Sequence, residues 1–190
     1  GPCLVGAADG ARVLADCPGT YYLSAEDQSN GCVAVDSVLV RRDDSFPVAE
    51  AGDPATLTCA VPSATLNGGD SSQSGNFSYR WSGPSVIAGG NTLLPEVGAP
   101  GWYTLLVTDL DNNCQSVDSV EVSEDRTLPV ADAGPGQVID CAQPVVTVGG
   151  PSSSAGVSFT YPWSSPNGVI SGPNNGSILR VDIPGTYELL

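Results

Sequence analysis

The feature that most constrains this chain is a long internal repeat. The segment Cys-x2-Val-Asp-Ser-Val occurs at 32–38 and again at 114–120, and Pro-Val-Ala-x-Ala-Gly occurs at 47–52 and again, at the same offset, at 129–134. A fixed spacing of this kind is typical of one structural unit copied along a chain. The fold therefore has to be one that a segment of about 80 residues can complete and that can follow itself in tandem.

Further matches set the limits of the repeated unit. Tyr-x-Trp-Ser occurs at 79–82 and 161–164, and Pro-Gly-x-Tyr occurs at 18–21, 100–103 and 184–187, where the last interval is slightly longer. One complete module is therefore predicted at residues 47–128. Residues 1–46 correspond to the C-terminal part of an earlier module, and residues 129–190 to the N-terminal part of a later one.

The two partial modules allow two interpretations. They could complete each other between neighbouring chains, in the manner of donor-strand polymers. However, residues 1–23 repeat the segment from about 165 to 190, so the two fragments overlap instead of adding up to one module. The sequence therefore favours a window from a longer array.

Short apolar runs separated by turn residues predict the fold of a module. Phe77 to Trp81 alternates large apolar and polar residues, as a half-buried strand does, and no segment has helical periodicity with caps. Further strands are expected at 56–59, 64–67, 103–107 and 117–122, the last two joined by a turn at 109–113. The predicted fold class is all-β, a series of tandem immunoglobulin-like β-sandwich modules.

The charge and the missing residue types exclude several functions. The 21 acidic residues outnumber six arginines, which gives a net charge of −15, and the chain has no His, Lys or Met. Nucleic acid and anionic membrane surfaces are poor partners for such a chain. Imidazole acid–base chemistry, Schiff bases and histidine-ligated zinc are absent, so we expect no enzyme. The sequence has no run of 18 apolar residues, which is the length that a membrane-spanning helix needs, so we expect no membrane insertion.

The six cysteines indicate disulfides, because Cys-x-x-Cys spacing and histidines for a zinc site are missing. Cys59 and Cys114 flank Trp81 in the sequence, which predicts a disulfide between early and late strands. Cys3 and Cys17 are predicted to pair locally, while Cys32 and Cys141 need partners outside the chain. Pairing of Cys32 with Cys17 or Cys3 is the alternative. Disulfides imply an oxidising, extracellular location.

Together these motifs resemble the PKD and immunoglobulin-like tandem repeats of large secreted bacterial surface proteins of the adhesin type. The resemblance extends over the whole chain and is carried by Pro-Val-Ala-x-Ala-Gly, Tyr-x-Trp-Ser, Pro-Gly-x-Tyr and Cys-x2-Val-Asp-Ser-Val. It implies β-sandwich modules that serve as stalks, spacers or adhesive arms on a bacterial cell surface.

Acidic residues at the two module junctions are candidate calcium ligands. Ca²⁺ takes six to eight oxygen ligands, which carboxylates and backbone carbonyls at a junction could supply. The alternative is a solvated linker with a weak Arg–Asp pair. No cofactor is otherwise required. The candidate ligands are Asp43, Asp44 and Glu50 at the first junction, and Glu124, Asp125 and Asp132 at the second.

Two further kinds of site are predicted. Ser37 and Ser119 lie in Asp-Ser-aliphatic segments, which resemble the O-glycosylation acceptors of some secreted bacterial proteins. Trp102 precedes the tyrosine of Pro-Gly-x-Tyr, so strand alternation turns it outward, where it could stack on a sugar or a partner module.

The sequence thus predicts a non-catalytic extracellular repeat protein that forms a cell-surface stalk or fibre. Its expected partners are neighbouring modules, other copies of the chain and surface glycans. One alternative is a carbohydrate- or protein-binding module of a secreted enzyme. Another is a self-assembling filament subunit whose terminal modules are completed by other chains.

Overall fold

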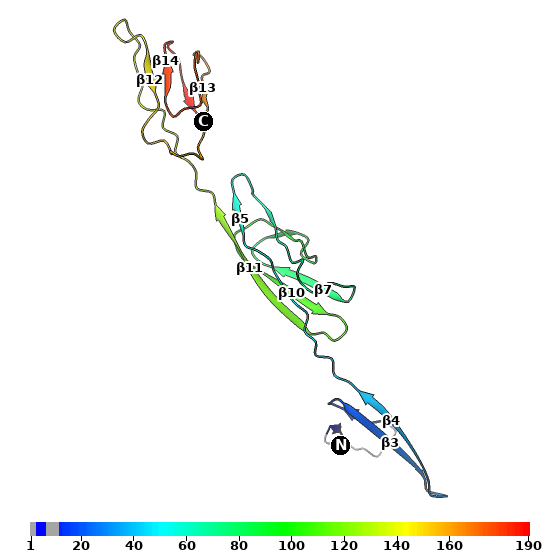
Figure 1. Ribbon diagram of the computed structural model, residues 1–190. Coiled ribbons are helices and arrows are strands. Elements are labelled where there is room, and N and C mark those ends of the chain that lie inside the picture. The colour runs from blue at the N-terminus through cyan, green and yellow to red at the C-terminus, as the bar shows by residue number, and fades with distance from the viewer. Residues whose placement is uncertain (1–2, 7–11) are drawn as a thin grey trace. The chain divides into compact units, whose positions relative to one another are not determined.

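The computed structural model describes residues 3–6 and 12–190, and the remaining positions of the predicted 1–46 fragment lie outside the described residues. The chain divides into two compact units, Gly1–Asp125 and Arg126–Leu190. All regular elements are strands (Figure 1), and no described helix is long and apolar enough to cross a membrane. The strands are β1 (Leu4–Val5), β2 (Leu14–Ala15), β3 (Gly19–Asp27), β4 (Cys32–Val40), β5 (Ala55–Thr58), β6 (Ala64–Thr65), β7 (Phe77–Ser82), β8 (Val86–Ala88), β9 (Glu96–Val97), β10 (Gly101–Asp109), β11 (Gln115–Asp125), β12 (Val146–Val148), β13 (Trp163–Ser164), β14 (Leu179–Val181) and β15 (Glu188–Leu189).

Strands β3 and β4 form an antiparallel hairpin in unit 1. The register pairs Gly19 with Val40 and Asp27 with Cys32, and the turn contains Gly31 at φ +73°. Apart from Val40, every residue of β4 is exposed. The side chains of the hairpin alternate as they do in strands that pack on a core, yet the hairpin has no core of its own.

Residues 47–125 of unit 1, called the complete module after the expectation from the sequence, contain a main sheet in the order β5-β11-β10-β7. Strands β10 and β11 pair in antiparallel fashion, with Tyr103 opposite Val120, and Asn113 adopts φ +60° in the turn between them. This is the hairpin turn predicted at 109–113. Strand β5 pairs with the end of β11 in parallel, which places Thr58 opposite Asp125.

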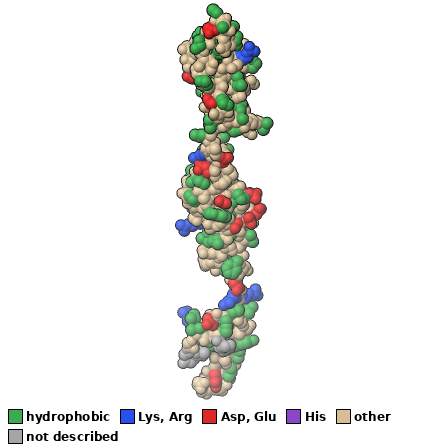
Figure 2. All heavy atoms as spheres, turned by 90° about the vertical axis from the view of Figure 1, so that its left-hand side faces the viewer, with side chains coloured by type: hydrophobic (Ala, Val, Ile, Leu, Met, Phe, Trp, Pro, Cys, Tyr) green, Lys and Arg blue, Asp and Glu red, His purple; other side chains and the backbone are tan. Residues whose placement is uncertain are grey.

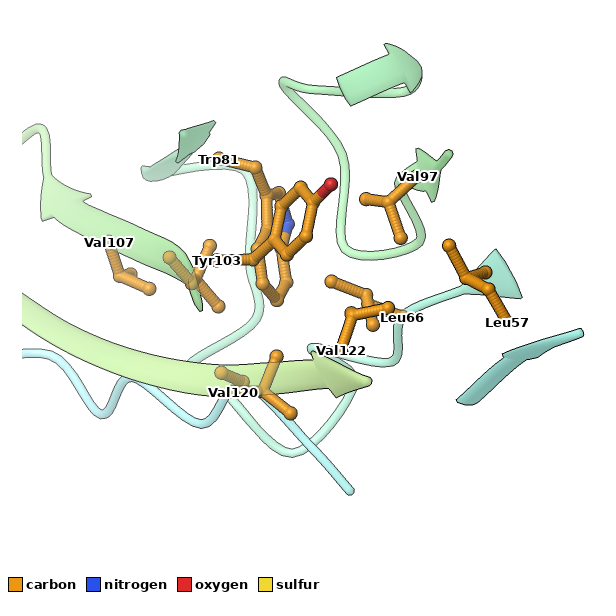
Figure 3. Close-up of a cluster of buried hydrophobic side chains, with 10 residues drawn as sticks. Leu57, Leu66, Trp81, Val97, Tyr103, Val107, Val120 and Val122 are labelled. Carbon is orange, nitrogen blue, oxygen red and sulfur yellow. The ribbon is translucent and has the colours of Figure 1, made fainter. Parts of the chain in front are cut away.

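A second sheet, in the order β6-β9-β8, covers the other side of the module core. Figure 3 shows Trp81 and Tyr103 side by side in the core, with Val120 and Val122 reaching them from β11. Two sheets around one apolar cluster make this module a β-sandwich, in agreement with the predicted all-β class. The buried cluster consists of Ala51, Leu57, Leu66, Trp81, Val97, Tyr103, Leu105, Val107, Val120 and Val122.

The predicted Cys59–Cys114 disulfide is wrong, because both residues are free cysteines in the structure. Cys59 follows β5 at the end where Thr58 lies opposite Asp125, whereas Cys114 precedes Gln115 at the other end of β11. Eleven residues of strand separate these ends, or about 35 Å at roughly 3.3 Å per residue. A disulfide needs Cα atoms within about 7 Å.

The other cysteines divide into one bonded pair and two exposed thiols. Cys3 and Cys17 form the predicted local disulfide, with a Cα–Cα distance of 5.5 Å. That bond excludes the alternative pairing of Cys32 with either of them. Cys32 and Cys141 are free and exposed, and their pairing with partners outside the chain stays a prediction.

Unit 2 contains two short strand pairs, β12 with β14 and β13 with β15. Its buried cluster is Val146, Trp163, Leu179 and Val181, with Tyr187 and Ile139 packed against it. Of these residues, Ile139, Trp163, Val181 and Tyr187 correspond to Leu57, Trp81, Val97 and Tyr103 of the complete module's core. Unit 2 thus has an apolar cluster of its own, built around an indole as in the complete module.

Candidate functional site

The tyrosine of Pro-Gly-x-Tyr makes the same hydrogen bond in all three places. Its hydroxyl donates to the backbone oxygen four residues earlier, at 2.7 Å from Tyr21 to Cys17, 2.8 Å from Tyr103 to Ala99 and 2.8 Å from Tyr187 to Ile183. The Pro-Gly turn brings the preceding backbone close to the ring. The tyrosine hydroxyl therefore finds its acceptor in the same segment of the chain. The motif therefore has a structural role, and its tyrosine hydroxyl is already engaged with the backbone.

Tyr-x-Trp-Ser has an equally structural role. The indole N–H of Trp81 donates to Thr92 O at 2.9 Å, and that of Trp163 donates to Gly176 O at 2.9 Å. Tyr79 donates to Ser72 O, and Tyr161 makes the equivalent bond to Ser154 O one repeat later. The polar ends of these aromatic side chains are thus satisfied by loop carbonyls.

The two remaining motifs meet in the complete module. The backbone N–H of Ala51, in Pro-Val-Ala-x-Ala-Gly, donates to Asp118 Oδ2 at 2.7 Å, and Asp118 belongs to Val-Asp-Ser-Val on β11. Gly52 follows at φ +79°, and a Cβ atom there would overlap the backbone oxygen of Asn67. The first loop of the module is therefore held by a carboxylate that arrives 67 residues later in the chain.

In unit 2 the equivalent of this meeting point is a groove of about 480 Å³. The backbone N–H of Ala133, the counterpart of Ala51, has no acceptor among the residues that the structure describes. Ile139 and Tyr187 are only half-buried, whereas their counterparts Leu57 and Tyr103 are fully buried. The apolar lining includes Ala133, Ile139, Val146, Val148, Val181 and Tyr187.

In the complete module, β11 lies at the place equivalent to this groove. In the complete module, the counterparts of the lining residues belong to the cluster that contains Val120 and Val122, or pack against it. Residues 137–140, which correspond to β5, form no strand, because β5 pairs only with β11.

The predicted calcium ligands at the first junction are not gathered together. Among the described residues, Asp43, Asp44 and Glu50 do not form a group of three close carboxylates. Asp43 Oδ1 instead accepts hydrogen bonds from Ser45 N at 3.1 Å and Asn112 Nδ2 at 3.3 Å. These bonds, first that from the Ser45 backbone, hold the pKa of Asp43 below its usual value.

At the second junction, Glu124 and Asp125 end strand β11, and Asp132 lies in unit 2. Asp132 Oδ1 accepts from Gly134 N at 2.9 Å and Oδ2 accepts from Ser152 N at 3.2 Å. The Gly134 bond is the main cause of a lowered pKa at Asp132. Asp132 therefore closes a local loop with its own carboxylate.

The predicted modification and binding residues are on the surface. Ser37 and Ser119 are both exposed, and Ser119 Oγ lies 2.9 Å from Thr104 Oγ1 across the β10–β11 pair. Trp102 is 62% exposed while the adjacent Tyr103 is fully buried, so the outward orientation predicted for the indole is confirmed. Figure 2 shows acidic side chains grouped on one visible part of the surface.

Comparisons with known proteins give a weak similarity to a solved domain structure. No family model and no curated protein matches the chain. The solution structure of the PKD domain from the KIAA 1837 protein is similar over 52% of this chain and 100% of that chain, with 31% identity and a TM-score of 0.35. The function proposed below rests on the geometry of the chain itself.

Proposed function

We propose that this chain is a non-catalytic structural part of an extracellular surface protein, built from tandem PKD-like β-sandwich modules that form a stalk, an adhesive arm or a fibre. The observation that supports this most directly is the use of the repeated motifs. Their aromatic and acidic side chains all bond to the module's own backbone, and the aromatic bonds recur at the repeat spacing. Repetition thus preserves a fold and not a reactive site.

The charge and the exposed serines of the surface support the remaining parts of the proposal. A net charge of −15 keeps modules soluble and apart. Exposure of Ser37 and Ser119 leaves room for glycans at both positions. The partners would be neighbouring modules, other copies of the chain and surface glycans.

A carbohydrate- or protein-binding module of a secreted enzyme is a second candidate, favoured by one residue. Trp102 presents an exposed indole on an ordered strand, and such a ring can stack on a sugar face. Under this alternative, the indole would supply affinity and the sandwich would only position it.

Retention on a panel of immobilised polysaccharides separates the two candidates. A structural module should pass through every resin, whereas a binding module should be retained and should lose retention in Trp102→Ala. Tyr22→Ala is the matched control, since Tyr22 is an exposed aromatic on the N-terminal hairpin. Retention that depends on Trp102 and not on Tyr22 would overturn the structural proposal.

A further inference from the structure

The turn between β10 and β11 contacts the segment that leads into the complete module. The side-chain amide of Asn112 donates from Nδ2 to Ser45 O at 2.9 Å and to Asp43 Oδ1 at 3.3 Å. Residues 41–46, called the linker, lie outside any strand and are all exposed. A side chain that comes 67 residues after Ser45 thus fixes a segment that has no packing of its own.

The orientation of this amide follows from a third hydrogen bond. Asn112 Oδ1 accepts from the backbone N–H of Cys114 at 2.8 Å, so the oxygen of the amide already has a donor in its own turn. The Nδ2 atom then faces two acceptors, Ser45 O and Asp43 Oδ1. A reversed amide would place its oxygen against a carbonyl and a carboxylate and would lose these bonds. Asn112 is therefore bound as a donor toward the linker and as an acceptor toward the strand.

The turn that carries Asn112 is itself held in place. The backbone N–H of Asn113 donates to Asp109 O at 2.8 Å, and Asn113 adopts φ +60°, a conformation that asparagine tolerates. Asn76, in the loop before β7, donates from Nδ2 to Asp111 Oδ2 at 2.6 Å. The turn is thus tied both internally and to a second loop, so Asn112 has little freedom to follow a moving linker.

The linker meets Asn112 as an ordered turn. Asp43 Oδ1 also accepts from Ser45 N at 3.1 Å, which closes residues 43–45 into a local turn. Asn112 bonds to both ends of that turn. Pro47, two residues further on, is buried. The chain is therefore held at Ser45 and again at Pro47, with only Phe46 between these two points.

We propose that Asn112 is a latch that fixes the direction in which the linker enters the complete module, and that it thereby stiffens the connection to the N-terminal hairpin. The inference rests on the modular part of the proposed function, and it adds the residue that limits bending. It assigns this task to a neutral amide, whereas the sequence suggested carboxylates and calcium at the same junction. The latch needs no metal ion, because residues of this chain supply both its donor and its acceptors.

The substitution Asn112→Asp tests the latch with little change of shape. The new carboxylate can still accept from Cys114 N, but it cannot donate, and it lies against Ser45 O and the like charge of Asp43. In the isotope-labelled full chain, we expect the NMR order parameter of the Ser45 amide to fall from about 0.85 to below about 0.6. The amide of Leu105, in the module core, should keep its order parameter, since the substitution leaves the core unchanged.

The matched control is Asn30→Asp, because Asn30 Oδ1 accepts from Cys32 N at 2.8 Å in the equivalent turn of the N-terminal hairpin. This variant should leave the Ser45 amide as ordered as before. Asp43→Ala changes the latch from the linker side, outside the module core, and should also lower the order of Ser45. Calcium chloride and EDTA should change none of these values. Unchanged order in Asn112→Asp, an equal loss in Asn30→Asp, or order that appears only with calcium would overturn the latch.

Spin labels on Cys32 and Cys59 measure the effect on bending. Both thiols are free and exposed, one in the hairpin and one in the complete module, and the variants Cys114→Ser and Cys141→Ser remove the other free thiols. In this background, the distribution of distances between the labels should broaden when Asn112→Asp is added. Equal widths would overturn the role of the latch in stiffness. Retention on polysaccharides would contradict the structural function but would leave the latch intact.

Discussion

At the scale of single residues, tyrosine hydroxyls hold this fold at its turns. Tyr103 donates to Ala99 O and accepts from Ser85 N at 3.2 Å, so one hydroxyl joins two loops of the module. The ring is fully buried beside Trp81, where an unpaired polar group is expensive. The same side chain thus supplies apolar packing and a bridge between loops.

Replacing Tyr103 by Phe should remove the bridge and keep the packing. Because the acceptor Ala99 O and the donor Ser85 N lose a partner in a partly buried place, we expect a loss of about 1–2 kcal/mol in the free energy of unfolding. Urea denaturation measures it. Tyr22→Phe is the control, since Tyr22 is 74% exposed, and an equal effect there would contradict the argument.

The cysteine pairing could be predicted from the sequence only in part. Cys59 and Cys114 flank Trp81 in the sequence, and that order suggests a disulfide across the core. The distance between Cys59 and Cys114 depends on the direction in which β5 runs along β11. A parallel pairing of only four residues has no recognisable sequence pattern. The local pair Cys3–Cys17 needs no such information and could be predicted.

At the scale of elements, β11 organises the complete module. It is the longest strand, it pairs with β5 on one edge and β10 on the other, and it delivers Asp118 to the first loop. Its inward residues alternate with exposed ones, so each substitution on it has a neighbour that serves as a control.

Val122→Ala should therefore destabilise the module far more than Val117→Ala. Val122 is buried between the sheets, and losing two methyl groups in a packed core costs about 2 kcal/mol. Val117 is exposed, and its substitution should change the unfolding free energy by less than about 0.5 kcal/mol. Chemical denaturation of both variants provides the comparison, and similar values would contradict the assigned faces of β11.

The long strands could be predicted because alternation is visible over several successive residues. Strands β7, β10 and β11 fall where Phe77–Trp81, 103–107 and 117–122 were expected. Strands β8 and β9 were missed, since they are very short and their pairing is irregular between Val86 and Ala88. The groove was missed too, because its lining residues are brought together by the fold and not by any motif.

At the scale of the molecule, the stability of the complete module should not depend on a disulfide. Its core cluster contains no cysteine, and Cys59 and Cys114 are free. A disulfide closing so long a loop would contribute about 4 kcal/mol.

Hydrogen exchange at the Leu105 and Val107 amides, measured with and without dithiothreitol, tests this. Both residues are buried in the module core, and their protection should not change on reduction. The double variant Cys59→Ser/Cys114→Ser should give the same protection as the unchanged chain. Exchange that is faster by a factor of about a thousand in the reduced or variant chain corresponds to about 4 kcal/mol, and it would show that a Cys59–Cys114 disulfide does form.

The bond between Ala51 and Asp118 also has a consequence for biosynthesis. During translation, the first loop of a module leaves the ribosome long before the strand that secures it, since 67 residues separate the two. Until β11 has emerged, Val120 and Val122 cannot join the module core, and contacts of such long sequence separation make folding slow. The nascent module therefore exposes apolar core residues during that interval, and a chaperone that shields them would be most needed then.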